Sequence, residues 1–225
     1  MVIDVLNMRA QMDLQRATWG ELSDEIRDYA ALDLPNQLKT PRGQALLSLV
    51  DPFSYRAELT KPKLILLSTN DRYWPLDALK LYWSELPNPK HVLYVPNQGH
   101  GLRDVDRVIG GLSAIHRYAA SGKVLPRTSW SFASTSAAID IHVATDRAAR
   151  RVLIWSARSP TRDFRDARWS SRPCSRKGAV YGCSTVRAQQ GYTAAFAETS
   201  FQDPGAPLFS TTTTVCIAGA GNTKP

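Results

Sequence analysis

Apolar and polar residues follow two patterns in the first half of the chain. Short continuous apolar runs, each bounded by polar or turn residues, are typical of strands buried on both faces of a parallel sheet. The predicted strands of this kind cover residues 2–6, 63–69 and 91–95. Between them, apolar residues recur at helical spacing, as Leu22, Ile26 and Tyr29 do. The predicted helices cover residues 19–29, 41–50, 76–86 and 104–120, with Asp77 as the N-cap of the third.

The order of these segments predicts the fold class. Strands that alternate with helices indicate an α/β protein with a parallel sheet, and residues 7–60 form a helical insertion. Near residues 122–130 the pattern changes to Ser/Thr-rich segments with alternating apolar residues. We therefore predict a partial α/β domain over residues 1–122 and a β-rich domain over residues 126–220. Strands of a small antiparallel sandwich are predicted at residues 129–133, 138–144, 151–157, 192–201 and 209–217.

The net charge of +8 is concentrated in one stretch. Residues 146–187 hold ten arginines and one lysine against three aspartates, an excess equal to that of the whole chain. Such a stretch suits an anionic partner, for example a glycan or lipid headgroups, but a solvated strand face is the favoured interpretation. No nucleic-acid-binding motif accompanies it. The chain has no apolar run long enough to cross a bilayer and no signal-peptide pattern at its start.

The three cysteines leave two alternatives open. Cys174 and Cys183 pair if the protein is exported, with Cys216 left over, and all three are thiols in a reducing compartment. None lies in a CxxC pair or near a histidine, so no zinc site is expected. No phosphate-binding loop is present, and we expect no cofactor.

Asp71 and His100 carry the candidate chemistry. Asp71 directly follows the predicted strand 63–69, and His100 lies in a Gly-His-Gly sequence just after the strand 91–95. Catalytic groups gather at the carboxyl ends of strands in open α/β sheets. An aspartate there can orient a histidine that acts as general base. Taken singly, Asp71 is more often a turn residue and His100 a loop residue, and it is their joint placement after successive strands that favours a catalytic role.

The nucleophile that such a pair needs is missing from the sequence. In α/β-hydrolases the chain order is nucleophile, acid and histidine, which Asp71 and His100 follow. No Gly-x-Ser-x-Gly sequence occurs among the 225 residues. A serine acting with this pair is therefore expected upstream of Met1. The other histidines, at positions 91, 116 and 142, are expected to be structural.

Many short segments along the chain together carry a family resemblance. They are residues 2–8, 19–23 with 28–29, 50–56, 62–66 with 70–71, 86–90, 94–97 with 100, 125–126 with 130, 153–155, 163–165 with 169, and 191–193 with 198. In these segments the chain resembles the PhoPQ-activated pathogenicity-related proteins. The resemblance covers nearly the whole chain, and autocrine proliferation repressors are relatives of the family. It implies an α/β-hydrolase-like fold followed by a β-rich region, usually in an exported protein.

The resemblance also assigns roles. Asp71 and His100 match the family's acid and histidine positions, whereas Gly101 stands where a serine is usual. The family's serine-bearing turn lies just before the segment that opens this chain. We therefore expect an N-terminally truncated hydrolase-like chain that is inactive alone.

Two functional hypotheses follow from these expectations. In the first, the chain is the acid–histidine part of an esterase- or amidase-like protein, whose strand at residues 2–6 pairs with a missing N-terminal half or with another chain. That strand would otherwise be a bare, aggregation-prone edge. In the second, an exported, non-catalytic protein binds anionic glycans or lipid headgroups through residues 146–187, with Trp155, Trp169 and Tyr181 interleaved among the arginines.

Overall fold

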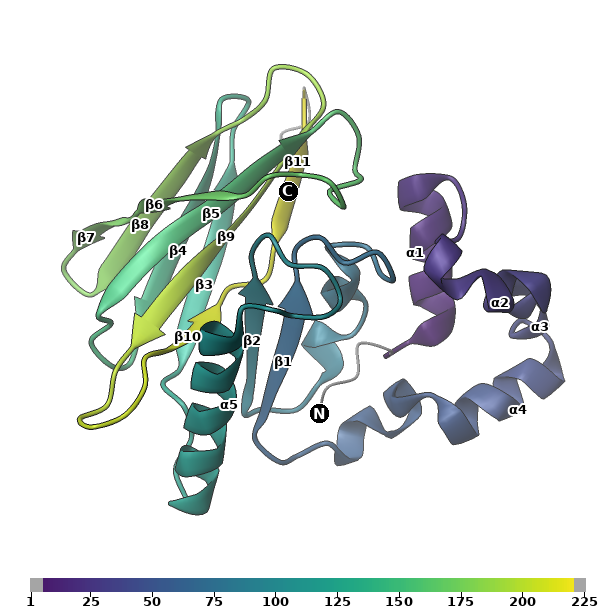
Figure 1. The fold of residues 1–225 in the computed structure, drawn as a ribbon, viewed down its shortest axis with the longest axis horizontal. Coiled ribbons are helices and arrows are strands. Elements are labelled where there is room, and N and C mark those ends of the chain that lie inside the picture. Colours follow the sequence, from purple (N-terminus) through teal and green to yellow (C-terminus); the bar gives the residue numbers. More distant parts are fainter. Residues whose placement is uncertain (1–5, 221–225) are drawn as a thin grey trace.

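The computed structural model describes residues 6–220 as a mixed α/β structure, shown in Figure 1. A β-sandwich lies on one side of a pair of parallel strands, and the first four helices lie on the other side. The predicted strand at residues 2–6 falls outside the described residues except for Leu6, whose side chain is buried.

The larger of the two sheets is mixed rather than purely parallel. Across the sheet the strands follow the order β1 (Lys63–Ser68), β2 (Lys90–Val95), β10 (Phe209–Thr212), β9 (Tyr192–Phe201), β5 (Arg151–Ser159) and β6 (Ser170–Pro173), and β11 (Cys216–Gly219) also pairs with β9. Among the strands of residues 6–220, only β1 and β2 pair in parallel, in register from Lys63↔Lys90 to Ser68↔Val95. β10 joins β2 antiparallel and so connects the parallel pair to the sandwich.

The second sheet is antiparallel throughout and completes the sandwich. Its order is β3 (Thr128–Ser134), β4 (Ala138–Thr145), β8 (Val180–Val186) and β7 (Ser175–Lys177). Ile139, Ile141 and Val143 of β4 are fully buried against Val152 and Ala195 of the larger sheet. The period-two alternation in the sequence therefore marks the strand face that forms the sandwich core.

Helix α5 (Val105–Ala120) packs on β1, β2 and β10 of the larger sheet. It begins after Asp104, whose side chain accepts a hydrogen bond from the backbone N–H of Arg107. The helix approaches the chain before β10 so closely that a Cβ on Gly110 would lie 2.3 Å from the carbonyl oxygen of Leu208. A glycine inside the helix is thus required by packing rather than by the helix itself.

Most of the remaining helices precede β1. They are α1 (Met8–Trp19), η1 (Asp24–Ile26), α2 (Arg27–Ala31), α3 (Leu34–Gln37), α4 (Pro41–Val50) and η2 (Pro52–Glu58), with η3 (Ala78–Leu81) and η4 (Trp83–Glu85) between β1 and β2. The predicted helix at residues 41–50 is confirmed as α4. The predicted helix at 19–29 is wrong in its start and its continuity: Gly20, with φ of 84°, ends α1 at Trp19, and helical structure resumes only with η1 and α2.

Three further predictions need correction. Residues 76–86 form two short 3₁₀ turns instead of one helix, and the Asp77 side chain makes no cap hydrogen bond. It pairs instead with Lys80 and Arg162, at 2.6 and 2.5 Å. The predicted strand at 209–217 is two strands, β10 and β11, which pair with different stretches of β9.

Strands from both predicted domains contribute to the larger sheet. Residues 121–127 connect α5 to β3, at the predicted boundary. Because β10 of the second part pairs with β2 of the first, the hydrogen-bonded sheet runs across both parts. The division into domains 1–122 and 126–220 stays a prediction.

Candidate functional site

The candidate site lies where the two parallel strands end. The backbone N–H of Thr69 donates to the carbonyl oxygen of Val95 at 3.1 Å, and that of Asn70 donates to Gln98 at 3.0 Å. These bonds extend the pairing beyond β1 and β2. The two chain segments therefore leave the sheet side by side, which brings the residues that follow them together.

Asp71 and His100 are in hydrogen-bond contact. Oδ2 of Asp71 lies 2.9 Å from Nδ1 of His100. The Asp71 side chain is only 9% exposed, whereas that of His100 is 53% exposed. The carboxyl group of the pair is therefore shielded from solvent, and the imidazole is accessible to it.

The contact defines which histidine nitrogen is left to react. With Asp71 as a carboxylate, which only accepts hydrogen bonds, the contact places the donor role on Nδ1 of His100. In the neutral imidazole Nε2 then has a free lone pair. Among the described residues Nε2 has no hydrogen-bond partner. An imidazole held in this way can accept a proton at Nε2.

Neighbouring groups hold the carboxyl group and the ring in place. Oδ1 of Asp71 accepts from the backbone N–H of Tyr73 at 2.7 Å, and Oδ2 also accepts from the hydroxyl of Ser68 at 3.3 Å. The Tyr73 ring packs against His100 with centroids 4.2 Å apart. Gln15 of α1 donates to the Tyr73 carbonyl. The turn after β1 is therefore fixed from the helical side.

A loop of the β-rich part holds the same turn from the other side. Nδ2 of Asn70 donates to the carbonyl oxygens of Phe164, Arg165 and Ala167, at 3.3, 3.1 and 2.7 Å. After β2, Asn97 exchanges two hydrogen bonds with the Trp169 backbone. These two asparagines were not identified from the sequence as site residues. The available signal was their position, since each stands just past the end of a buried strand.

The remaining histidines lie away from the candidate site. His91 is buried in β2, and His116 and His142 are exposed on α5 and β4.

In the arginine-rich stretch 146–187, Arg147 pairs with Asp203, while Arg187 is buried. The buried Arg187 guanidinium group donates to the backbone carbonyls of Thr135 and Gly219. Two of the three aromatic residues proposed to stack on an anionic partner, Trp169 and Tyr181, are buried as well.

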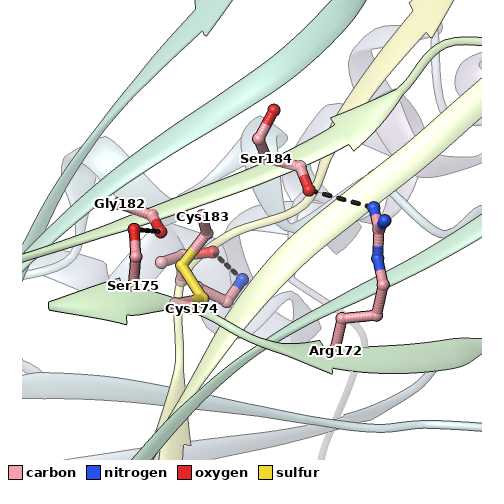
Figure 2. Close-up of a disulfide and its surroundings, with 8 residues drawn as sticks. Arg172, Cys174, Ser175, Gly182, Cys183 and Ser184 are labelled. Carbon is pink, nitrogen blue, oxygen red and sulfur yellow. Dashed lines mark hydrogen bonds between the residues drawn. A yellow bond between two sulfur atoms is a disulfide. The ribbon is translucent and has the colours of Figure 1, made fainter.

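Cys174 and Cys183 form a disulfide, shown in Figure 2. Cys174 lies between β6 and β7, and its backbone N–H donates to Val152 of β5, whereas Cys183 belongs to β8. The disulfide therefore links the two sheets. Cys216 is a free thiol, and burial raises its pKa to about 11.

Residues 6–220 contain neither a cluster of metal ligands nor a membrane-spanning helix. No group of three or more His, Cys, Asp or Glu side chains in this range is arranged to hold a metal ion. None of the helices in it is long and apolar enough to cross a membrane.

Fold and site together describe a mixed α/β protein with an acid–histidine pair at the carboxyl ends of two parallel strands. The sequence model of the family described as PhoPQ-activated pathogenicity-related protein matches residues 1–165, so the chain belongs to this family. The family resemblance seen in the sequence is thereby confirmed over residues 1–165.

Two individual proteins are similar to parts of the chain. Autocrine proliferation repressor protein A from Dictyostelium discoideum is 34% identical over 103 residues, which are 45% of this chain and 21% of that protein. The chain thus spans about a fifth of that relative's length. The solved structure described as "Crystal structure of Br derivative BhCBM56" aligns over 43% of this chain and 95% of that one, with 11% identity and a TM-score of 0.31. A likeness this weak carries no argument.

Proposed function

We propose that Asp71 and His100 are the acid and the general base of a serine-hydrolase-like site, which a serine from outside these 225 residues completes. The observation that carries the proposal is the 2.9 Å contact between the Asp71 carboxyl group and His100 Nδ1, with Nε2 left open. In a catalytic triad the aspartate orients the imidazole and stabilises its cation, and Nε2 takes the proton of the serine.

The position and order of the pair support an α/β-hydrolase-like arrangement. Both residues follow the carboxyl ends of adjacent parallel strands, and the acid precedes the histidine by one strand. Within the described residues β1 has a strand neighbour on one side only. In our proposal the open side of β1 pairs with the strand that comes before β1 in a hydrolase sheet. The serine lies on the far side of that preceding strand.

The chain alone is proposed to have no measurable esterase activity. In α/β-hydrolases the turn that bears the serine also supplies one backbone N–H of the oxyanion hole. Loss of one such donor costs about 3–4 kcal/mol of transition-state stabilisation, or roughly 10²–10³ in rate. Without the serine, His100 has no nucleophile hydroxyl to deprotonate, and without the backbone donor the oxyanion lacks one of its hydrogen bonds.

Complementation tests the proposal. The chain is fused to the amino-terminal segment of a full-length family member and assayed with p-nitrophenyl esters, beside the chain alone. We expect hydrolysis only in the fusion, lost by about 10³-fold or more in His100→Ala. His116→Ala is the matched control, because His116 is an exposed histidine on α5 that belongs to no part of the site.

The result is interpretable either way. A fusion that folds but hydrolyses nothing, or one whose activity survives His100→Ala and falls in His116→Ala, contradicts the proposal. Binding of anionic glycans or lipid headgroups by residues 146–187 stays a prediction, and the burial of Trp169 and Tyr181 removes part of its basis.

A further inference from the structure

A cavity lies at the other end of the parallel strands. The cavity, of about 530 Å³, opens between the start of β2 and the first strands of the second sheet. Its lining includes Trp83, His91, Thr128, Trp130 and Thr211. His91 is the second residue of β2, whereas His100 follows the end of that strand, so this cavity is separate from the candidate catalytic pair. Its volume is in the range of small-molecule sites.

Three polar atoms of the cavity's residues lack hydrogen bonds. Nε2 of His91 and Oγ1 of Thr128 and Thr211 are all buried, and none has a partner among the described residues. A buried polar group without a partner is rare and costly in folded proteins. These three belong to three different strands and yet surround one cavity. A change in χ1 of a threonine, or in χ1 and χ2 of the histidine, would bring these atoms to the cavity surface.

The cavity is suited to a neutral ligand rather than an anion. The Lys90 ammonium group is engaged by the carbonyl oxygens of Trp83 and Leu86, at 2.5 and 2.7 Å. Arg127 pairs with Asp146 at 3.4 Å. Both cationic side chains that line the cavity are therefore already partnered. Burial lowers the pKa of His91 to about 4, so its ring is neutral at physiological pH.

Two tryptophans contribute an aromatic part to the cavity wall. The rings of Trp83 and Trp130 have their centroids 6.1 Å apart, with Trp83 from η4 and Trp130 from β3. An aromatic wall packs against the C–H face of a ring, while hydroxyl groups and a neutral imidazole exchange hydrogen bonds with groups that both donate and accept. Saccharides combine these two surfaces in one small molecule.

We propose that this cavity binds a neutral saccharide, which stacks on the Trp83–Trp130 wall and hydrogen-bonds with His91, Thr128 and Thr211. The site goes beyond the proposed hydrolase function and does not depend on it. Its occupancy requires neither Asp71 nor His100, which follow the opposite ends of the strands.

The test is titration of the intact chain with neutral disaccharides. Maltose, cellobiose, lactose and diacetylchitobiose are each added up to ~10 mM. Binding is followed by calorimetry and by the NMR signals of the tryptophan side chains. We expect at least one of the four to bind and to shift the Trp83 and Trp130 indole signals more than those of Trp19 and Trp74. Tripolyphosphate serves as the anionic probe, and preferential binding of that anion in this cavity overturns the proposal.

Two matched variants separate binding from folding. Thr128→Val and Thr18→Val each remove a buried, unpartnered hydroxyl from a half-buried threonine, but only Thr128 lines the cavity. Thr128→Val is expected to weaken the disaccharide about tenfold or more without lowering the thermal midpoint, and Thr18→Val is expected to leave affinity unchanged. Absence of binding by all four disaccharides, or equal affinity in both variants, overturns the proposal and leaves a water-filled cavity.

Discussion

His91 offers a prediction whose size follows from its burial. The imidazole is 7% exposed, and desolvation lowers its pKa from 6.5 to about 4, against the attraction of Asp146 and with a smaller repulsion by Lys63. Above pH 6.5 the ring is neutral in both the folded and the unfolded chain, so it adds no pH dependence there. Below pH 6.5 the unfolded chain takes up a proton that the folded chain does not. The free energy of unfolding therefore falls as the pH drops from 6.5 to about 4.

The expected loss from this one group is about 3 kcal/mol, since each unit of pKa difference is worth about 1.4 kcal/mol. Urea unfolding is measured at several pH values between about 7 and 4 for the natural chain and for His91→Gln. The difference between the two curves isolates His91 from the carboxyl groups that titrate in the same range. We expect the variant to lose much less stability on acidification. Identical pH dependence in both chains would refute the reasoning, because it would mean that His91 is not buried as a neutral group.

Three further predictions concern parts of the fold. Replacing both Cys174 and Cys183 with serine removes a disulfide that spans nine residues, and chain entropy predicts that the free energy of unfolding in urea falls by about 2.5 kcal/mol. A double variant as stable as the disulfide-bonded chain would contradict this. Gly110→Ala places a Cβ against the Leu208 carbonyl and should cost about 1–3 kcal/mol, seen as a lower thermal midpoint, with an unchanged midpoint as the contrary result. Asn70→Ala leaves the carbonyl oxygens of three loop residues without their shared donor, so faster hydrogen exchange is expected in residues 164–169. Unchanged protection there would contradict the idea that Asn70 holds this loop.

The buried strands could be predicted because their pattern is local. The apolar runs that became β1 and β2 carry their signal in consecutive residues, and the alternation at Ile139, Ile141 and Val143 marks β4 in the same way. Strands β6 and β7 carried no such signal. Every residue of these two strands is exposed, and the strands exist because they pair with β5 and β8.

Part of the candidate site could be predicted for the same reason and part could not. Two strand ends that are adjacent in a parallel sheet place Asp71 near His100, so spacing and topology were enough for the pair. The partners of Asn70 lie more than 90 residues further along the chain, in the loop before β6. Only the folded arrangement of the β-rich part brings that loop to the ends of the parallel strands, and no local pattern encodes it.

The central claim is that Asp71 holds His100 with its proton on Nδ1 and with Nε2 free. The most direct measurement is the pair of imidazole ¹⁵N shifts of His100 in the neutral form, with the exposed His116 as an internal reference. The account predicts that His100 is predominantly the Nδ1–H tautomer and that Asp71→Asn abolishes this preference, while His116 keeps the tautomer ratio of a free imidazole in both chains. A His100 that shows the same ratio as His116, unaffected by Asp71→Asn, would contradict it.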